Sequence, residues 1–379
     1  MEPDVSDSSC PACGEAVAAD AAFCEACGAQ VLSNNRPKGR MSDTVGQAAD
    51  GQDTGRQQGG GVESAGEVAA GQESPISTPT VIGAPASAIP LPPVPCAECG
   101  GAVGTDGYCE RCGLKAPRAR DHFREQPAPW VAGVCDRGLV HARNEDAMAL
   151  WAGGARAVLV VCDGVSSSLD SDVAALAAAR TARDVLRAPW PQGAGTAESA
   201  DAAAVKVLEA AAAAANAAVV AGTAPSSPSP ASCTFVAAVI EGALLRYAVI
   251  GDSRAYWLPD AGEAIQLTQD DSMATLLMAA GIPRAQAEAA PQAHAITKWL
   301  GRDSTDIVPV CGVRTLDGPG WVLVCSDGLW NYASEAATLR AFIDQAGVLE
   351  PLGVALALLD VAKTAGGHDN ITVSLARIA

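Results

Sequence analysis

Residues 233–252 read CTFVAAVIEGALLRYAVIGD, two apolar runs that meet at Glu241 and Gly242. Each run is rich in Val, Ile and Leu and ends in Gly, Asp or Ser, a pattern that predicts a β-strand. No helical segment separates the runs, so they are expected to pair as a hairpin with antiparallel strands. This stretch therefore predicts an antiparallel sheet in the fold.

Further strand-like runs flank this hairpin, at residues 130–136, 147–152, 156–163, 253–258, 307–313, 321–327 and 370–378. Long apolar segments with helical spacing lie between some of them, at residues 172–187, 202–220, 272–280, 334–346 and 352–363. Helices thus intervene only in places. The pattern predicts an α+β sandwich of strands covered by helices.

The composition of the chain limits its partners. With 43 acidic and 25 basic residues the net charge is -18, and this field repels nucleic acid and anionic lipid. The first ten residues, MEPDVSDSSC, lead into no apolar segment, so no secretory signal is expected. The alanine-rich run that follows Lys206 and Glu209 falls short of a bilayer span. We expect a cytoplasmic protein that binds neither nucleic acid nor membrane.

Thirteen cysteines in a reducing compartment favour metal over disulfides, and eight of them form four CxxC pairs. Pairs about ten residues apart predict four-cysteine zinc ribbons at residues 1–32 and 96–114, each with one structural Zn²⁺. Residues 33–95 lack periodicity and predict a disordered linker, and residues 115–127 a short linker before a main domain at 128–379. Because residues 1–30 contain no Lys or Arg, we expect the ribbons to dock onto a protein partner. The predicted zinc ligands are Cys10, Cys13, Cys24, Cys27, Cys96, Cys99, Cys109 and Cys112.

Five aspartates stand where predicted strands begin or end: Asp146, Asp163, Asp252, Asp327 and Asp369. A single Asp-Gly pair is usually a turn. Five such positions are harder to explain as turns, because clustered acids repel one another unless cations neutralise them. Oxygen ligands without nearby His or Cys favour Mg²⁺ or Mn²⁺ over Zn²⁺.

Seven motifs in the main domain carry a family resemblance. They are, in chain order, GLVHARNED from Gly138, VCDG, GDSRAY, LTQDDS, HAITKWLG, SDGLW and HDNIT. In this order they resemble the bacterial type 2C metal-dependent serine/threonine protein phosphatases, and residues 128–379 look like that phosphatase domain. The resemblance implies a two-layer antiparallel β-sandwich flanked by helices, in the order α-β-β-α.

The resemblance also implies a site. It would hold two Mn²⁺ or Mg²⁺ ions through Asp146, Asp163, Asp327, Asp369 and the Gly164 carbonyl, with Asp163 bridging, and a third, weaker ion at Asp252 and Asp327. Two such ions activate a water molecule for direct attack on phosphorus. The implied activity is hydrolysis of phosphoserine and phosphothreonine on phosphoproteins, in opposition to serine/threonine kinases. A flap between Asp271 and Gly301 would lie beside this site.

One position departs from the family pattern. Where the family has a phosphate-binding Arg, this chain has His141. We therefore assign His141, with Asp146 and Asp163, to the catalytic set, and His141 and Arg143 to substrate binding, against the alternative that His141 has no substrate role. Two other functions stay open: a catalytically impaired phosphoprotein-binding scaffold, and a phosphatase of sigma-factor regulators.

Overall fold

The computed structural model describes residues 99–104, 108–113, 116, 119–191 and 195–379, and the backbone of a strand pair, β1 (Ser8–Ser9) and β2 (Ala16–Val17). The chain divides into two compact units, Asn34–Ala116 and a second unit made of Met1–Ser33 with Pro117–Ala379. The predictions of a first ribbon and of a linker at 33–95 concern residues that lie almost entirely outside this description.

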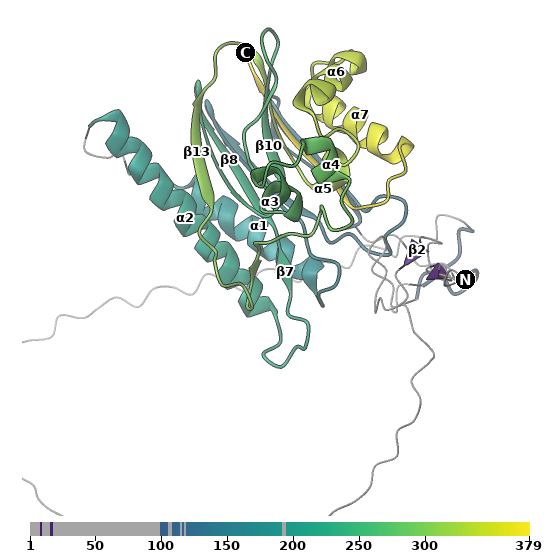
Figure 1. Cartoon of the computed structure of the whole chain (residues 1–379). Helices are drawn as coiled ribbons and strands as arrows, with labels where there is room; N and C mark the ends of the chain where they lie inside the picture. The colour runs from purple at the N-terminus through teal and green to yellow at the C-terminus, as the bar shows by residue number, and fades with distance from the viewer. Residues whose placement is uncertain are drawn as a thin grey trace, which may run out of the picture. The chain divides into compact units, whose positions relative to one another are not determined.

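Two antiparallel sheets form the centre of the main domain (Figure 1). The six-stranded sheet has the order β11-β10-β14-β15-β4-β3, and the five-stranded sheet the order β13-β9-β8-β6-β5. A short pair, β12 (Leu300–Gly301) with β7 (Ser232–Cys233), accompanies them. The strands of the six-stranded sheet are β3 (His122–Ala128), β4 (Val131–Asp136), β10 (Arg254–Pro259), β11 (Ile265–Gln266), β14 (Gly320–Cys325) and β15 (Ile371–Ile378). Those of the five-stranded sheet are β5 (Ala147–Gly153), β6 (Arg156–Cys162), β8 (Phe235–Glu241), β9 (Leu244–Ile250) and β13 (Val310–Thr315).

The predicted hairpin is confirmed. Strands β8 and β9 pair antiparallel, and Glu241 lies opposite Leu244, so the connection consists of Gly242 and Ala243 alone. Gly242 has a φ of 59°, a conformation that glycine adopts without strain. The tight turn fixes the register of the central strands of this sheet.

Helices cover the outer face of each sheet. Helices α1 (Ser171–Arg187) and α2 (Ala197–Gly222) share a core with the five-stranded sheet, and α6 (Ala336–Ala346) and α7 (Pro351–Thr364) share one with the six-stranded sheet. Figure 1 shows the two helix pairs on opposite sides of the strands. The α-β-β-α order implied by the family resemblance is therefore confirmed.

Successive side chains of a strand point to opposite faces of the sheet, and this explains how the apolar residues of the strands fill three cores. In β6, Leu159 and Val161 face the opposite sheet, while Val158 and Val160 face the helices. Both faces of the strand are buried, so the sequence shows a continuous apolar run rather than alternation. Burying each such aliphatic side chain stabilises the fold by roughly 1.5–3 kcal/mol.

Helix α2 is long and apolar enough to span a membrane by length and composition, and no other single helix among the described residues meets that criterion. About a third of its most apolar window is buried. Leu208, Ala211, Ala215 and Val219 contribute to the core that α1 and the five-stranded sheet share. The helix therefore has an apolar contact surface within its own domain.

The structure corrects one predicted boundary. Residues 122–127, assigned to the short linker before the main domain, form most of β3, which pairs with β4 at the edge of the six-stranded sheet. The sequence HFREQPA lacks an apolar run because an edge strand that is exposed on one side needs few apolar residues. The sheet thus begins before residue 128.

Two short helices form the predicted flap region. Helices α3 (Met273–Ala279) and α4 (Arg284–Glu288) pack around a small apolar cluster of their own that contains Ala274, Ala287 and Ala293. A single turn, α5 (Asp327–Trp330), follows β14 directly. The sequence pattern predicted neither α4 nor α5, because both are too short to show helical periodicity.

Candidate metal centre

The five predicted aspartates converge although they come from both sheets. Asp146 precedes β5, Asp163 follows β6, Asp252 lies between β9 and β10, Asp327 begins α5, and Asp369 precedes β15. Four of these residues line one pocket of about 190 Å³ together with Gly164; they are Asp163, Asp252, Asp327 and Asp369. Asp146 is fully buried and interacts electrostatically with Asp163 and Asp369. The fold therefore gathers these carboxylates at one end of the strands.

Glycines allow the loops of this site to approach one another closely. A Cβ on Gly138 would lie 2.0 Å from the carbonyl oxygen of Asp369, and the φ of Gly138 is 72°. A Cβ on Gly328 would lie 2.0 Å from the carbonyl oxygen of Asn370. Any larger residue at either position would push the Asp369 loop away from its neighbours.

Hydroxyl groups hold the buried carboxylate of Asp146. Its Oδ2 accepts hydrogen bonds from Ser326 Oγ at 2.6 Å and from Thr372 Oγ1 at 2.7 Å. Its Oδ1, like Oδ1 of Asp327, is buried and accepts a hydrogen bond from no donor in the described part of the chain. The carboxyl of Asp163 lies within hydrogen-bonding reach of both Asp146 and Asp327.

Burial and mutual repulsion raise the pKa values of these acids. Burial is the main cause that raises the pKa of Asp146 to about 7 and that of Asp252 to about 7. The pKa values of Asp163 and Asp327 lie well above the ordinary value, first because of burial and then because of the neighbouring carboxylates. At neutral pH such a cluster favours either protons or cations.

The donor set fits hard divalent cations. It consists of carboxylate oxygens, two of which accept from no donor among the described residues, with the Gly164 backbone beside them in the pocket. Oxygen-only sites of this kind suit Mg²⁺ and Mn²⁺. Cations would satisfy the unpaired oxygens and remove the repulsion that raises the pKa values.

His141 lies against one of the predicted ligands. Its Nε2 is 3.4 Å from Oδ1 of Asp369, and the imidazole side chain is only 9% exposed. Arg137 Nη1 donates to the carbonyl oxygen of His141 at 2.9 Å and so fixes the loop at this position. The imidazole therefore belongs to the surroundings of the acid cluster.

Arg143 is held by protein groups. Its Nη2 donates to Glu145 Oε1 at 2.7 Å and to the carbonyl oxygen of Ser168 at 3.1 Å. It is not among the residues that line the pocket. These contacts engage Nη2 and hold that end of the guanidinium against Glu145 and Ser168.

Several residues of the site escaped the sequence analysis. Ser326 and Thr372 orient Asp146, and Asn370 accepts from the Glu145 N–H at 2.7 Å. Thr234 Oγ1 accepts from the Asp163 N–H at 2.9 Å, and His294 lines the pocket. Four of these residues lie within motifs quoted in the sequence analysis, and this was the available signal: Ser326 in SDGLW, Asn370 and Thr372 in HDNIT, and His294 in HAITKWLG.

The second cysteine unit brings three of its thiols together. The Sγ atoms of Cys99, Cys109 and Cys112 all lie within 4.8 Å of one another. Backbone N–H groups of Cys112 and Arg111 hold the pKa of Cys109 down at about 6, below that of an ordinary thiol. The predicted fourth ligand, Cys96, lies outside the described residues, as do Cys10, Cys13, Cys24 and Cys27.

Comparison with known proteins identifies the family. A family model described as protein phosphatase 2C matches residues 140–360, more than half of the chain. The chain belongs to the protein phosphatase 2C family.

The curated relatives are bacterial. The serine/threonine protein phosphatase PstP of Mycobacterium tuberculosis is 32% identical over 256 residues, which are 65% of this chain and 44% of PstP. The protein phosphatase PhpP of Streptococcus pneumoniae is 36% identical over 141 residues, 37% of this chain and 55% of PhpP. The chain thus spans about half the length of the curated relatives it matches.

Solved structures share the fold. The crystal structure of Mycobacterium tuberculosis PstP/Ppp has a TM-score of 0.52 and 29% identity, and covers 65% of this chain and 97% of its own. A PstP catalytic domain in complex with two manganese ions has a TM-score of 0.50 and 28% identity, and the match covers 66% of this chain and 98% of the PstP chain.

Proposed function

We propose that this protein is a Mn²⁺- or Mg²⁺-dependent phosphatase that hydrolyses phosphoserine and phosphothreonine on proteins. The observation that carries the proposal is the convergence of five aspartates in a protein phosphatase 2C fold, four of them lining one pocket and Asp146 buried in contact with that cluster. The manganese ions in the related PstP structure support the choice of metal. Phosphoproteins are then the substrates, and serine/threonine kinases the opposing enzymes.

The proposed ligands are Asp146, Asp163, Asp327 and Asp369 with the Gly164 carbonyl, and Asp252 with Asp327 for a further ion. When bound, divalent ions lower the pKa of a water molecule and neutralise charge on the phosphate. The chain's own residues fix the ligands in place: Ser326 and Thr372 hold Asp146, and Thr234 holds the backbone of Asp163. The pocket lined by four of these acids, with a volume of about 190 Å³, would be the place of the substrate phosphate.

The direct test is hydrolysis of a phosphothreonine peptide by the purified full chain after treatment with a chelator. We expect activity to return on addition of Mn²⁺ or Mg²⁺ and to stay absent with Ca²⁺, which prefers more ligands and longer bonds. A protein that binds Mn²⁺ but releases no phosphate from the peptide or from p-nitrophenyl phosphate would contradict the proposal.

A second candidate function rests on His141. At this position the chain has an imidazole, which contacts Asp369, and it therefore lacks the guanidinium that grips phosphate bidentately. This substitution favours a scaffold that binds phosphoproteins and hydrolyses them slowly. A scaffold would retain phosphopeptide binding with little turnover in the assay above.

Replacing His141 with Arg tests both candidates. A charge-assisted bidentate contact contributes about 1.5–3 kcal/mol, so we expect His141→Arg to lower the KM for a phosphopeptide by at least roughly tenfold. The matched control is His122→Arg, because His122 also pairs with an aspartate, Asp136, at 2.8 Å, and Asp136, unlike Asp369, does not line the pocket. An unchanged KM in His141→Arg would remove position 141 from substrate binding.

We further propose that Cys96, Cys99, Cys109 and Cys112 hold a structural Zn²⁺, and that Cys10, Cys13, Cys24 and Cys27 hold another. The close approach of three thiols and the lowered pKa of Cys109 support the first of these sites, because zinc binds the thiolate. Both units would serve to dock a protein partner.

Zinc content of the purified full chain checks this assignment. We expect about two equivalents of zinc in the wild type and about one in Cys109→Ser, because a site reduced to three thiolates loses most of its affinity. Cys311→Ser is the control, since Cys311 lies in β13 and is not part of the thiol cluster. Equal zinc content in Cys109→Ser and the wild type would contradict the site.

A further inference from the structure

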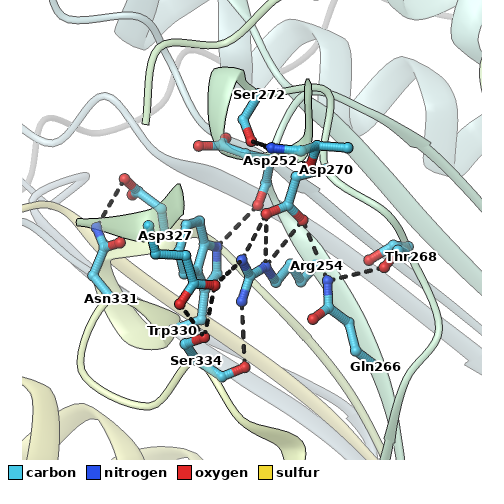
Figure 2. Close-up of polar contacts among 12 residues, drawn as sticks. Asp252, Arg254, Gln266, Thr268, Asp270, Ser272, Asp327, Trp330, Asn331 and Ser334 are labelled. Atoms are coloured by element: carbon cyan, nitrogen blue, oxygen red, sulfur yellow. Dashed lines mark hydrogen bonds and ion pairs between the residues drawn. The ribbon is translucent and has the colours of Figure 1, made fainter. Parts of the chain in front are cut away.

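Arg254 occupies the centre of a buried polar network beside the acid pocket (Figure 2). It is the first residue of β10 and is only 3% exposed. Its Nε lies 3.0 Å from both carboxylate oxygens of Asp270, and its Nη2 lies 2.6 Å from Oδ2. Three contacts to one carboxylate fix the plane of the guanidinium.

The guanidinium also stacks on an aromatic ring. Its central carbon lies 3.5 Å from the centroid of Trp330, so the flat cation covers the face of the indole. Trp330 is 3% exposed and is therefore packed on its other sides as well. Arg254 thus joins Asp270 to Trp330.

Trp330 links two of the candidate metal ligands. Its Nε1 donates to the carbonyl oxygen of Asp252 at 2.9 Å. It is also the last residue of α5, whose first residue is Asp327. A helix of one turn has too few hydrogen bonds of its own to set its orientation, so the packing of Trp330 determines where Asp327 lies relative to Asp252.

The network continues away from the pocket. Arg254 Nη1 donates to the carbonyl oxygen of Ser334 at 3.4 Å, and Ser334 Oγ contacts Glu288 at the end of α4. Gln266 Nε2 donates to Asp270 Oδ1 at 3.3 Å. The hydrogen bonds of Arg254 thus go to Asp270, to Tyr256 and to the segment after α5, and its charge also interacts with Asp252.

We propose that Arg254 is a positioning residue: held by Asp270, it clamps Trp330 and thereby sets the spacing of the carboxylates of Asp252 and Asp327. The inference deepens the proposed function, because those two carboxylates are candidate ligands of a divalent ion. Arg254 is not among the residues that line the pocket. It acts on the affinity for metal and not on the binding of substrate.

Three variants test this role in the full chain. Arg254→Lys keeps a charge beside Asp270 but lacks the flat fork that stacks on Trp330. Arg254→Met combined with Asp270→Asn removes both charges, so that no unpaired charge stays buried. Trp330→Phe keeps an aromatic ring and removes the N–H that bonds the Asp252 carbonyl.

The measurement is calorimetric titration of the metal-free protein with Mn²⁺, together with the Mn²⁺ concentration that gives half-maximal hydrolysis of p-nitrophenyl phosphate. Residues that orient metal ligands typically change metal affinity by about 10–100-fold. We expect the dissociation constant of the weaker Mn²⁺ site to rise by at least about tenfold in all three variants. The KM for substrate at saturating Mn²⁺ should stay within about twofold of the wild-type value.

Arg377→Met is the matched control. Arg377 also stacks on a tryptophan, Trp321, at 5.0 Å and pairs with an aspartate, Asp260. Arg377 lies opposite Trp321, near the start of β14. Arg254 lies opposite Cys325, at the end of β14 next to the acid pocket. Its Mn²⁺ affinity should match that of the wild type.

Folded Arg254 variants that bind Mn²⁺ as tightly as the wild type would overturn the inference, as would an equal loss of affinity in Arg377→Met. If the wild type binds Mn²⁺ but hydrolyses no phosphoester, and the Arg254 variants still bind Mn²⁺ more weakly, the proposed function fails while the positioning role stands. If the wild type hydrolyses phosphoesters and the Arg254 variants bind Mn²⁺ as tightly as the wild type, the positioning role fails while the proposed function stands.

Discussion

Asp163→Asn is expected to lower kcat/KM for p-nitrophenyl phosphate with Mn²⁺ by at least roughly 10³-fold, which corresponds to about 4 kcal/mol of transition-state stabilisation. Asp163 is the carboxylate within reach of both Asp146 and Asp327, so its amide would deprive two candidate ions of one shared ligand. Asp360→Asn is the control, since Asp360 is exposed on α7. It should retain wild-type activity.

The same variant should be more stable when metal is absent. Burial and four neighbouring carboxylates disfavour the ionised form of Asp163 and raise its pKa well above the ordinary value. The neutral amide removes this penalty, so the melting temperature of Asp163→Asn in EDTA at pH 7.5 should exceed that of the wild type. Loss of activity with lowered stability in EDTA would instead indicate a damaged fold and would contradict the assignment of Asp163 to a metal centre.

The second large effect is a loss of stability in the metal-free wild type as pH rises from about 5 to 7. The pKa values of Asp146 and Asp252 are raised to about 7 in the folded state, so between the unfolded value and pH 7 the native protein binds more protons than the unfolded chain. Unfolding free energy therefore falls with pH in this window, and Asp163 and Asp327, whose pKa values also lie well above the ordinary value, contribute to the decline in the same direction. Between pH 5 and 7 each group contributes about 2–3 kcal/mol, or roughly 5–10 °C in melting temperature for a domain of this size.

Thermal unfolding in EDTA and in Mn²⁺ across this pH range checks the prediction. Mn²⁺ binds the ionised carboxylates, so it should abolish the decline and raise the melting temperature most at pH 7.5. Asp260 provides an internal contrast: Arg377 lowers its pKa to about 2, so its contribution is lost only as pH falls through the acid range. A melting temperature in EDTA that is flat or rises from pH 5 to 7 would refute the high pKa values.

Sequence determined most of the central strands and the main helices. The hairpin at Gly242 and the buried strand β6 could be predicted because each consists of continuous apolar runs, which must be covered on both faces. The predicted helix at 202–220 is longer in the structure, where a cap at Thr196 extends α2 to Ala197–Gly222. Strand β3 and the single turn α5 were missed, because an exposed edge strand and a four-residue helix carry too little periodicity to be seen.

The acids of the site could likewise be proposed from sequence, since each borders a strand and lies in a family motif. The contacts that orient these acids could not be predicted from the sequence. Residues 146 and 372 are far apart in the chain, yet the Thr372 hydroxyl orients Asp146, and His141 meets Asp369 in the same way. No local pattern encodes such pairs, because the packing of two sheets brings them together.

The sequence by itself thus determined which residues carry charge and which strands carry them to one end of the sandwich. Only the tertiary structure decided which oxygen of Asp146 is left without a donor among the described residues. It also decided that the guanidinium of Arg254 packs on Trp330, whose N–H donates to the Asp252 carbonyl. The physical reason is that local sequence sets backbone conformation and apolar faces. The pKa values and the spacing of the acids depend on burial and on neighbours that arrive from distant parts of the chain.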